Sequence, residues 1–396
     1  MEKPRVGMVF VGMPLMKNGE GYFCKASIFN MLGHAPQFLD IELLCPVLRG
    51  GGEGYGVDVA GIVVHPLSGW TSGFDLYGRK FILIALQIFR LFRRLSERWD
   101  AVVIIDPDPM SHVAYFFARI MRKRCILYLR GDDTFEILGR NPEGGRGVLA
   151  GLWCRCIRFS IASMLRHCVG VVTGRALFER YRSLDPILYY ASAVSEAQLA
   201  QRQEVEKPFR TGKAPLRLLM VGYLAAYKGY DIAIEAVGLL HKCEGSVHLD
   251  IIGTGPDECR LRALAGKAGV SAMVSFRGFV PYGRRLFDFY GKADVFLLMS
   301  RSEGTPKVVP EAFSFGLPVV ASRVGGVPDM VKDRENGILL PLLTAEALSL
   351  ALQRLIDSPE TLGRLSEGAF RSARQYSVER QLKSAIHEAG RRFLCP

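Results

Sequence analysis

The 396-residue sequence lacks any Cys-x-x-Cys pair, and its cysteines are odd in number. Zinc sites and disulfide frameworks usually need paired or clustered cysteines. Cys154 and Cys156 lie close together, but no second pair or histidine cluster completes a site. With no recognisable secretory leader, these absences lead us to expect reduced thiols in a cytoplasmic protein. The nine cysteines are Cys24, Cys45, Cys125, Cys154, Cys156, Cys168, Cys243, Cys259 and Cys395.

No uncharged run is long enough to cross a bilayer, which takes about 18–20 residues. The nearest stretch, Lys80–Trp99, is interrupted by four arginines, the first of them Arg90. One interpretation is a buried helix that has its arginines on the solvent face and precedes a strand. The other is a basic surface, flanked by the aromatic residues of Gly69–Lys80, that contacts anionic lipid headgroups. Under the second interpretation the protein is peripheral on the cytoplasmic face of a membrane.

Low-complexity tracts, short repeats and nucleic-acid-binding signatures are also absent, although the formal net charge is +12. The basic excess is spread evenly along the chain. Residues 1–200 hold 24 Lys and Arg against 18 Asp and Glu, and the remainder holds 27 against 21. An even excess favours phosphate-bearing ligands or an anionic membrane over a nucleic-acid arm.

The residues that are present predict two α/β domains. Hydrophobic residues make up 49% and charged residues 23%, as in globular proteins, and the length exceeds that of one ordinary core. Short continuous apolar runs, each ending in Gly or Asp, are typical of strands buried on both faces of a parallel sheet. In the first half these runs are RVGMVFVG, AVVIID, RCILYLRG and CVGVVTG.

A polar stretch, 186–215, separates this half from a second set of runs and contains a linker, QRQEVEKPFRTGKAP. After the second set, the C-terminal tail predicts three amphipathic helices. Two consecutive doubly wound units result, and such units bind ligands at loops directly after strands. The second set of runs is LRLLMVG, VHLDIIG, MVSFRG, DVFLLM and PVVAS.

Two of these loops have residues suited to an anion. Gly19 and Gly21 lie between a strand and an expected helix, where backbone N–H groups can approach an anion. Gly222 ends a strand, and Lys228 comes just before a helix. A lysine above a helix N-terminus suits a diphosphate. An ordinary turn and a surface lysine remain the structural alternatives.

Two further loops end strands in glycine. Gly253 and the glycine that precedes Phe279 leave room for a flat ring or a sugar against the backbone. Taken separately, each also fits a common turn.

The most distinctive loop holds two carboxylates. Glu303 begins a Gly-Thr-Pro turn after DVFLLM, and Glu311 lies in an expected helix from Lys307 to Phe315. The two glutamates are eight positions apart, too far for a pair on one helical face, so we expect them to contact different parts of a ligand. Carboxylates accept hydrogen bonds from vicinal sugar hydroxyls, and the amides of Thr305–Val308 would face an anion or hydroxyls.

This stretch, SEGTPKVVPEAFSFGLPVVASRVGGVPDMVKDRENGILL, resembles the Glu-x7-Glu signature region of the family-4 retaining glycosyltransferases, which have the GT-B fold. The match is strong over 216–375 and architectural over 1–190. The resemblance implies two Rossmann-like, doubly wound parallel-sheet domains facing a cleft. The domains would be 1–195 for the acceptor and 196–376 for the nucleotide-sugar donor, with a helix at about 377–396 packing back on the first.

The resemblance also implies roles for individual residues. Glu311 would hold the ribose hydroxyls, Glu303 the transferred sugar and Lys228 the diphosphate, whose growing charge it would stabilise. The remaining implied contacts are Gly21 with the diphosphate or sugar, Phe279 near the base, Gly222, Tyr223 and Gly253, and the Thr305, Pro306, Lys307 and Val308 backbone with sugar and phosphate oxygens.

Two positions depart from the family pattern. Tyr223 stands where the family usually has an arginine, and Lys307 is our candidate to replace that phosphate-binding cation. Arg130 stands where many members have a histidine, which excludes a neutral imidazole there. Arg130 would instead donate to the sugar or phosphate, beside the candidates Asp132 and Asp133.

Asp106-Pro107-Asp108 imitates an Asp-x-Asp metal motif, but no other metal ligands lie nearby in the sequence. We therefore interpret it as part of the acceptor side of the site, and expect no required metal or cofactor.

The resemblance implies an enzyme that moves a sugar from a nucleotide-diphosphate sugar to a glycan or lipid-linked acceptor, with retention, in cell-surface polysaccharide or glycolipid synthesis. A sugar-nucleotide epimerase and a non-catalytic binding or assembly protein are the alternatives. The presence of Glu303, Lys228 and Glu311 argues against the non-catalytic alternative.

Overall fold

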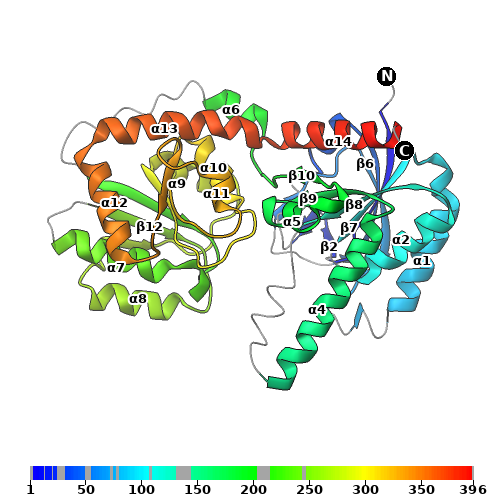
Figure 1. Cartoon of the computed structure of the whole chain (residues 1–396), viewed down its shortest axis with the longest axis horizontal. Coiled ribbons are helices and arrows are strands. Elements are labelled where there is room, and N and C mark those ends of the chain that lie inside the picture. Colours follow the sequence, from blue (N-terminus) through cyan, green and yellow to red (C-terminus); the bar gives the residue numbers. More distant parts are fainter. Residues whose placement is uncertain are drawn as a thin grey trace. The chain divides into compact units, whose positions relative to one another are not determined.

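A computed structural model describes residues 3–12, 14–19, 21–24, 32–49, 55–71, 75–76, 80–106, 109–130, 144–202, 215–242 and 247–394. They form two compact units, each built around one β-sheet (Figure 1). Unit 1 comprises Met1–Tyr190 and Gln381–Pro396, and unit 2 comprises Ala191–Arg380. The candidate residues Asp132 and Asp133 lie outside the described ranges.

The sheet of unit 1 has the strand order β10-β9-β8-β7-β1-β4-β2-β3-β5, with β6 paired to β4. Its pairs are parallel except at β2–β3 and β3–β5. The four strands predicted for this half, β1, β7, β8 and β9, pair in parallel as predicted, and the antiparallel pairs at one edge involve strands that the sequence did not predict. The strands are β1 (Arg5–Val9), β2 (Leu15–Asn18), β3 (Gly21–Cys24), β4 (Asp40–Arg49), β5 (Tyr55–Val57), β6 (Ile62–Ser68), β7 (Ala101–Asp106), β8 (Arg124–Leu129), β9 (Val169–Thr173) and β10 (Ile187–Tyr189).

The mixed edge corrects the prediction for Gly19 and Gly21. These glycines lie at a β2–β3 hairpin, in which Asn18 pairs with Gly21, and not between a strand and a helix. The Asn18 side chain accepts a hydrogen bond from the Gly21 N–H at 3.1 Å. Gly19 directly follows β2, and a glycine in the first position after a strand is typical of two-residue hairpin loops.

The helices of unit 1 cover its sheet. Helix α1 buries Ile84, Ile88, Phe92 and Leu95 on one face, as expected of a helix that precedes a strand. The Phe92 ring contacts the edge of Trp99 at 5.4 Å. The helices with described residues are α1 (Phe81–Leu95), α2 (Pro109–Ile120), α4 (Gly144–Leu165), α5 (Arg175–Arg180) and α14 (Val378–Leu394), with the short 3-10 helices η2 (Ala35–Gln37), η4 (Ser96–Arg98) and η5 (Arg182–Leu184).

Helix α14 begins in unit 2 and continues into unit 1 from Gln381. Its last turns contact unit 1, where the Arg124 guanidinium lies 5.6 Å from the centre of the Phe393 ring. The predicted assignment of an acceptor to 1–195 and a donor to 196–376 stays a prediction. Across the described ranges, none of the helices combines the length and apolarity that a membrane span requires.

The sheet of unit 2 is parallel throughout, with the order β13-β12-β11-β14-β15-β16. All five predicted runs form strands, and β16 adds a sixth. The strands are β11 (Leu216–Val221), β12 (Val247–Ile252), β13 (Val274–Phe276), β14 (Val295–Leu298), β15 (Val319–Ser322) and β16 (Gly337–Leu340). The helices are α6 (Glu196–Arg202), α7 (Tyr230–Lys242), α8 (Glu258–Lys267), α9 (Arg284–Lys292), α10 (Val308–Ser314), α11 (Val327–Met330), α12 (Ala345–Asp357) and α13 (Pro359–Ala373), with η6 (Ala226–Lys228) and η7 (Arg374–Tyr376).

The strand order of unit 2 positions its ligand site. The chain moves from β11 to β12 and β13 in one direction, then crosses to β14 and continues to β15 and β16 in the other. Because such crossovers are right-handed, the helices of the two halves cover opposite faces of the sheet. The loops after β11 and β14 consequently diverge, and a crevice forms at the carboxyl ends of these two strands.

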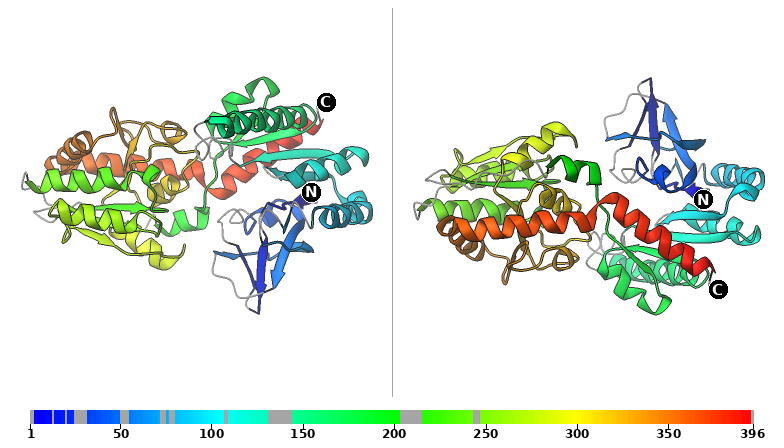
Figure 2. Two further views of the ribbon diagram at one scale, coloured as in Figure 1. Left: turned by 90° about the horizontal axis from the view of Figure 1, so that it is seen from below. Right: turned by 90° about the horizontal axis from the view of Figure 1, so that it is seen from above.

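The predicted C-terminal helices are present as α12, α13 and α14. Thr344 and Ser358 cap the first two, since their hydroxyl groups accept hydrogen bonds from the N–H groups of Ala347 and Thr361. Helix α12 packs against α7, and α13 packs against α10, on opposite sides of the sheet (Figures 1 and 2).

Candidate active site

A cavity of about 340 Å³ lies at the carboxyl ends of β11 and β14. Eight residues predicted from the sequence line it, and all belong to unit 2. They are Gly222, Tyr223, Lys228, Glu303, Thr305, Pro306, Lys307 and Val308. The other lining residues are Met220, Val221, Tyr227, Tyr230, Leu297, Leu298 and Ser300.

Two predicted residues from different loops meet in this cavity. The Lys228 ammonium group lies 2.7 Å from Oε1 of Glu303, and the Ser300 hydroxyl donates to the same oxygen at 2.6 Å. The Lys228 and Glu303 side chains are 22% and 8% exposed, so the ion pair is largely shielded from water. Both oxygens of a carboxylate accept hydrogen bonds, which leaves Glu303 further acceptor capacity for a ligand.

The backbone fixes Lys228 at this position. Gly229 ends η6 with a φ of 67°, and a Cβ there would lie 1.9 Å from the carbonyl oxygen of Met299. Arg301 holds η6 from the β14 side, because its guanidinium donates to the Ala226 carbonyl and makes two hydrogen bonds to Asp231, at 3.2 and 3.0 Å. The Lys228 ammonium also lies 5.3 Å from the centre of the Tyr227 ring.

Two neighbours of this pair have shifted pKa values. Burial acts to raise the pKa of Asp231, but the hydrogen bond and charge of Arg301 outweigh it, and the pKa of Asp231 is lowered. Burial, and then the charge of Glu303, raise the pKa of Tyr230, so this phenol stays neutral beside the carboxylate.

A glycine pair shapes the turn that carries Glu303. Gly325 has a φ of 51°, and a Cβ on it would lie 1.7 Å from the Glu303 carbonyl oxygen. The N–H of Gly326 donates to the Gly304 carbonyl at 2.9 Å. The Gly-Gly that follows β15 is therefore required by its contact with the turn after β14.

The start of α10 requires one correction. Pro306 has no N–H group, so only Thr305, Lys307 and Val308 of the predicted backbone donors can donate to a ligand. Helix α10 begins at Val308. Lys307 and Tyr223 line the same cavity, which keeps Lys307 as the candidate for the missing arginine.

Glu311 does not line this cavity, and a residue that the sequence did not indicate holds its carboxylate. The Tyr290 hydroxyl donates to Oε2 of Glu311 at 2.9 Å. Tyr290 is fully buried, with its ring stacked on Phe315 at 5.2 Å and on Phe296 at 5.9 Å. Burial, and then the charge of Glu311, raise the pKa of Tyr290, which keeps its proton available to the carboxylate.

The remaining predicted residues lie outside the lining of the cavity. Gly253 packs beneath it, since a Cβ there would lie 1.8 Å from the Gly222 carbonyl oxygen. Phe279 follows β13 and is 58% exposed. Gly21 and Arg130 belong to unit 1, where the Arg130 guanidinium lies 4.9 Å from the centre of the Phe10 ring.

Several residues of the site are not predicted from the sequence. Ser300 directly follows a predicted strand, and its position at a strand end is a sufficient reason to expect it in the site. Tyr227 precedes Lys228 in a loop after a strand, so its position also indicates the site. Tyr290 lies in helix α9, 21 positions before Glu311, and only the fold brings the two together.

Metal ligands do not cluster in the part of the chain that the structure describes, where no group of three or more His, Cys, Asp or Glu side chains could hold an ion. Asp106 ends β7, while Asp108 falls outside the described ranges. Cys154 is buried and Cys156 is exposed, so the two thiols of this pair occupy different environments on α4.

Comparison with known proteins supports this description. Residues 201–372 match the family model of Glycosyl transferases group 1. The amylovoran biosynthesis glycosyltransferase AmsK of Erwinia amylovora is 35% identical over 147 residues, 36% of this chain and 36% of that protein. The lipopolysaccharide core biosynthesis glycosyltransferase LpsE of Rhizobium meliloti is 31% identical over 150 residues, 38% and 42% of the two chains. The chain spans half or less of the length of these curated relatives.

A solved structure extends the likeness to the whole chain. The structure of Anabaena HepE in complex with UDP superposes with a TM-score of 0.67 at 13% identity, over 99% of this chain and 100% of that one. At this identity the likeness concerns the fold, which is the GT-B fold of glycosyltransferases. The match to the family model of Glycosyl transferases group 1 covers less than half of the chain and lies in unit 2, which also contains the cavity.

Proposed function

We propose that the protein transfers a sugar from a nucleotide-diphosphate sugar to an acceptor hydroxyl, with retention of configuration and without a metal ion or cofactor. The supporting observation is the meeting of Lys228 and Glu303 in one shielded cavity, at the ends of neighbouring strands. A cavity of about 340 Å³ is in the size range of small-molecule sites and suits the sugar and phosphate parts of such a donor.

In the proposed mechanism Lys228 binds the diphosphate. Its ammonium has three N–H donors, one of which reaches Glu303, so others can bind phosphate oxygens. The bond between the anomeric carbon and the diphosphate oxygen breaks with its electron pair on the diphosphate. The acceptor oxygen bonds to the same face of that carbon, and its proton passes to the leaving diphosphate. Lys228 stabilises the charge that grows during bond breaking.

The other proposed contacts are with the transferred sugar, the phosphates and the ribose. Glu303 accepts hydrogen bonds from hydroxyls of the transferred sugar. Lys307 binds a phosphate in place of the arginine that the family usually has at the position of Tyr223. Glu311 accepts the ribose hydroxyls. The hydrogen bond from Tyr290 to Oε2 supports this role, because it holds the Glu311 carboxylate in one orientation.

The acceptor is proposed from the relatives and from the sequence. AmsK and LpsE are named for the biosynthesis of amylovoran and of a lipopolysaccharide core, and the HepE structure contains UDP. We propose a glycan or lipid-linked acceptor in cell-surface polysaccharide or glycolipid synthesis, reached by a peripheral protein at the cytoplasmic face of the membrane.

A thermal-shift screen with UDP, GDP, ADP and TDP, alone and as their sugar conjugates, tests the donor. A ligand that binds only the folded protein raises the midpoint of unfolding, by an amount that grows with its concentration over Kd. We expect one nucleotide to stand out. If none raises the midpoint, the proposed function is wrong.

The donor that binds is then incubated with a membrane lipid extract in EDTA. A transferase releases nucleoside diphosphate only when the acceptor is present, and NMR of the product shows the retained anomeric configuration. An epimerase would change the donor sugar without an acceptor, and a non-catalytic protein would bind the donor without releasing diphosphate.

A further inference from the structure

Helices α1 and α2 of unit 1 expose large apolar side chains to solvent. On α1, Ile82, Leu83 and Leu86 are 72%, 45% and 47% exposed. On α2, Phe116 and Ile120 are 58% and 59% exposed. Single exposed apolar residues are common, but a contiguous group on neighbouring elements usually marks an interaction surface.

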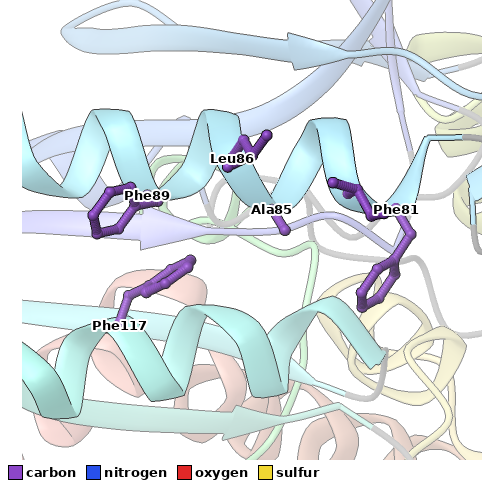
Figure 3. A pocket seen from close by; sticks show the side chains of 6 residues that line it. Phe81, Ala85, Leu86, Phe89 and Phe117 are labelled. Carbon is purple, nitrogen blue, oxygen red and sulfur yellow. The ribbon is translucent and has the colours of Figure 1, made fainter.

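A groove between the two helices joins these residues into one surface. Phe89 of α1 and Phe117 of α2 face one another, with ring centres 5.1 Å apart (Figure 3). Phe81 and Ala85 lie on the same side of α1, toward α2 (Figure 3). The groove has a volume of about 290 Å³, and each residue that lines it is apolar: Phe81, Ile82, Ala85, Leu86, Phe89 and Phe117.

The two helices run in the same direction. The strands β6, β7 and β8 all run parallel within the sheet of unit 1, so the helices that connect them, α1 and α2, also run parallel to each other. They lie side by side (Figure 2). Their carboxyl-terminal halves therefore occupy the same end of the surface.

That end is basic. The exposed face of α1 changes from apolar residues in its first turns to Arg90, Arg93 and Arg94 in its last turns. Helix α2 ends with exposed Arg119 beside Ile120, and exposed Arg122 follows. The sequences of the two helices contain no Asp or Glu. Within the described ranges, the nearest acidic residue along the chain is exposed Glu97 of η4.

We propose that this α1–α2 surface binds an anionic lipid bilayer. The apolar residues enter the boundary between headgroups and acyl chains, and the arginines contact headgroup phosphates, as in interfacial amphipathic helices. Arginine suits this position because its apolar stem lies along the surface while its guanidinium reaches the phosphate.

The charge pattern favours a bilayer over a second copy of the chain. In a symmetric dimer formed through this surface, the arginines of one copy would face either the arginines or the apolar residues of the other. Neither arrangement supplies negative charge. An anionic bilayer supplies both partners. Its acyl chains suit the apolar residues of the surface, and its headgroups suit the arginines.

This inference deepens the proposed function, since a lipid-linked acceptor is presented at such a membrane. It uses no residue of the cavity in unit 2. A membrane-binding experiment therefore needs neither donor nor acceptor, and its failure would leave the proposed transfer intact.

The test is flotation of the full chain with phosphatidylcholine vesicles, with and without phosphatidylglycerol. We expect binding to vesicles that contain phosphatidylglycerol at low salt, and much weaker binding to neutral vesicles or at high salt. Absence of binding at low salt, or binding that depends on neither lipid charge nor salt, would overturn the proposal.

A double variant tests whether the apolar residues of the α1–α2 surface contact the lipid. Leu86→Gln with Phe116→Gln should weaken vesicle binding about tenfold or more, because two large apolar groups no longer enter the lipid. The matched control is Phe159→Gln, since Phe159 is 70% exposed on α4 of the same unit. Equal loss in the control and the double variant would place the contact elsewhere and overturn the assignment.

A second pair of variants tests the basic half. Arg93→Gln with Arg94→Gln should weaken binding roughly 30-fold, from the contribution of each arginine near an anionic surface. The matched control, Arg354→Gln with Arg371→Gln, removes the same charge from exposed positions of unit 2. If both pairs reduce binding equally, only the net charge matters and the assigned surface is wrong. Circular dichroism of each variant verifies folding.

Discussion

The cavity of unit 2 and the α1–α2 surface of unit 1 are of opposite character. The cavity of unit 2 is built by backbone constraints, since Gly229 and Gly325 each lie against a carbonyl oxygen that leaves no room for a Cβ. The α1–α2 surface of unit 1 is built by side chains alone, on helices whose inner face is an ordinary core. A site that depends on backbone geometry leaves a glycine pattern in the sequence. A surface that depends on exposure leaves only periodicity, which indicates a helix but not the partner of its outer face.

The largest expected effect is a loss of sugar transfer when charged residues of the unit 2 cavity are replaced. Glu303→Gln removes the charge that faces Lys228, and Lys228→Ala removes the cation proposed to bind the diphosphate. Each should lower the transfer rate roughly 10²–10³-fold, as does the loss of a group that stabilises transition-state charge. Assays of nucleoside diphosphate release, with saturating donor, measure this loss.

Because the cavity and the α1–α2 surface lie in different units, we expect these variants to keep wild-type vesicle binding. We expect Leu86→Gln with Phe116→Gln to keep transfer to a detergent-soluble acceptor. Glu258→Gln, which changes a partly exposed glutamate paired with Arg262 on α8, is the control within unit 2. Unchanged transfer in both Glu303→Gln and Lys228→Ala would refute the proposed mechanism.

The same contrast explains how much could be predicted from the sequence. The parallel strands of unit 2, and the meeting of Lys228 with Glu303, follow from continuous apolar runs and from loops at strand ends. In unit 1, the β2–β3 hairpin does not follow from the sequence, because glycines after a strand fit both an anion-binding loop and a hairpin turn, and only the pairing of Asn18 with Gly21 separates the two.

Other features of the site depend on packing between distant segments. Tyr290 reaches Glu311 only because α9 and α10 pack together, with Phe315 stacked on the phenol ring. The groove between Phe89 and Phe117 likewise needs two helices that the chain separates by strand β7. Such contacts leave no local pattern in one sequence.

A glycine pair tests the claim that backbone constraint distinguishes the two units. Gly229→Ala forces a Cβ against the Met299 carbonyl at a φ of 67°, and should destabilise the protein by roughly 2–4 kcal/mol. Gly151→Ala, in helix α4 of unit 1 with no atom within 4 Å of the added Cβ, should stabilise it by about 0.5–1 kcal/mol. Thermal unfolding measures both, and shifts of the same sign and size would contradict the distinction.

A smaller effect is expected from Tyr290, which packing places against Glu311, the residue proposed to bind the ribose hydroxyls. Tyr290→Phe keeps the stack with Phe296 and Phe315 but removes the hydroxyl that donates to Glu311. We expect roughly tenfold weaker binding of the preferred nucleoside diphosphate, from the loss of a hydrogen bond to a charged group.

The 2′-deoxy form of the same nucleotide separates positioning from general damage. Wild-type protein should bind it more weakly than the ribonucleotide, and Tyr290→Phe should reduce this discrimination. Titration calorimetry with the two nucleotides gives both ratios. If the variant weakens both nucleotides equally, Tyr290 supports the fold and does not position Glu311.

The smallest expected effect is an acid dependence of stability that arises from the Asp231–Arg301 pair of unit 2. Arg301 holds the pKa of Asp231 below its usual value of about 3.9, despite the opposing effect of burial. A lowered carboxyl pKa contributes stability that is present above the pKa of the unfolded state and is lost as pH falls through the pKa of the folded state.

Asp231→Asn should therefore lower the unfolding midpoint at neutral pH, and its difference from wild type should shrink below about pH 4. Asp288→Asn, at an exposed position of α9, should show no such trend. A constant difference for Asp231→Asn across this range would mean that packing, and not the charge of the Asp231–Arg301 pair, holds η6 in place.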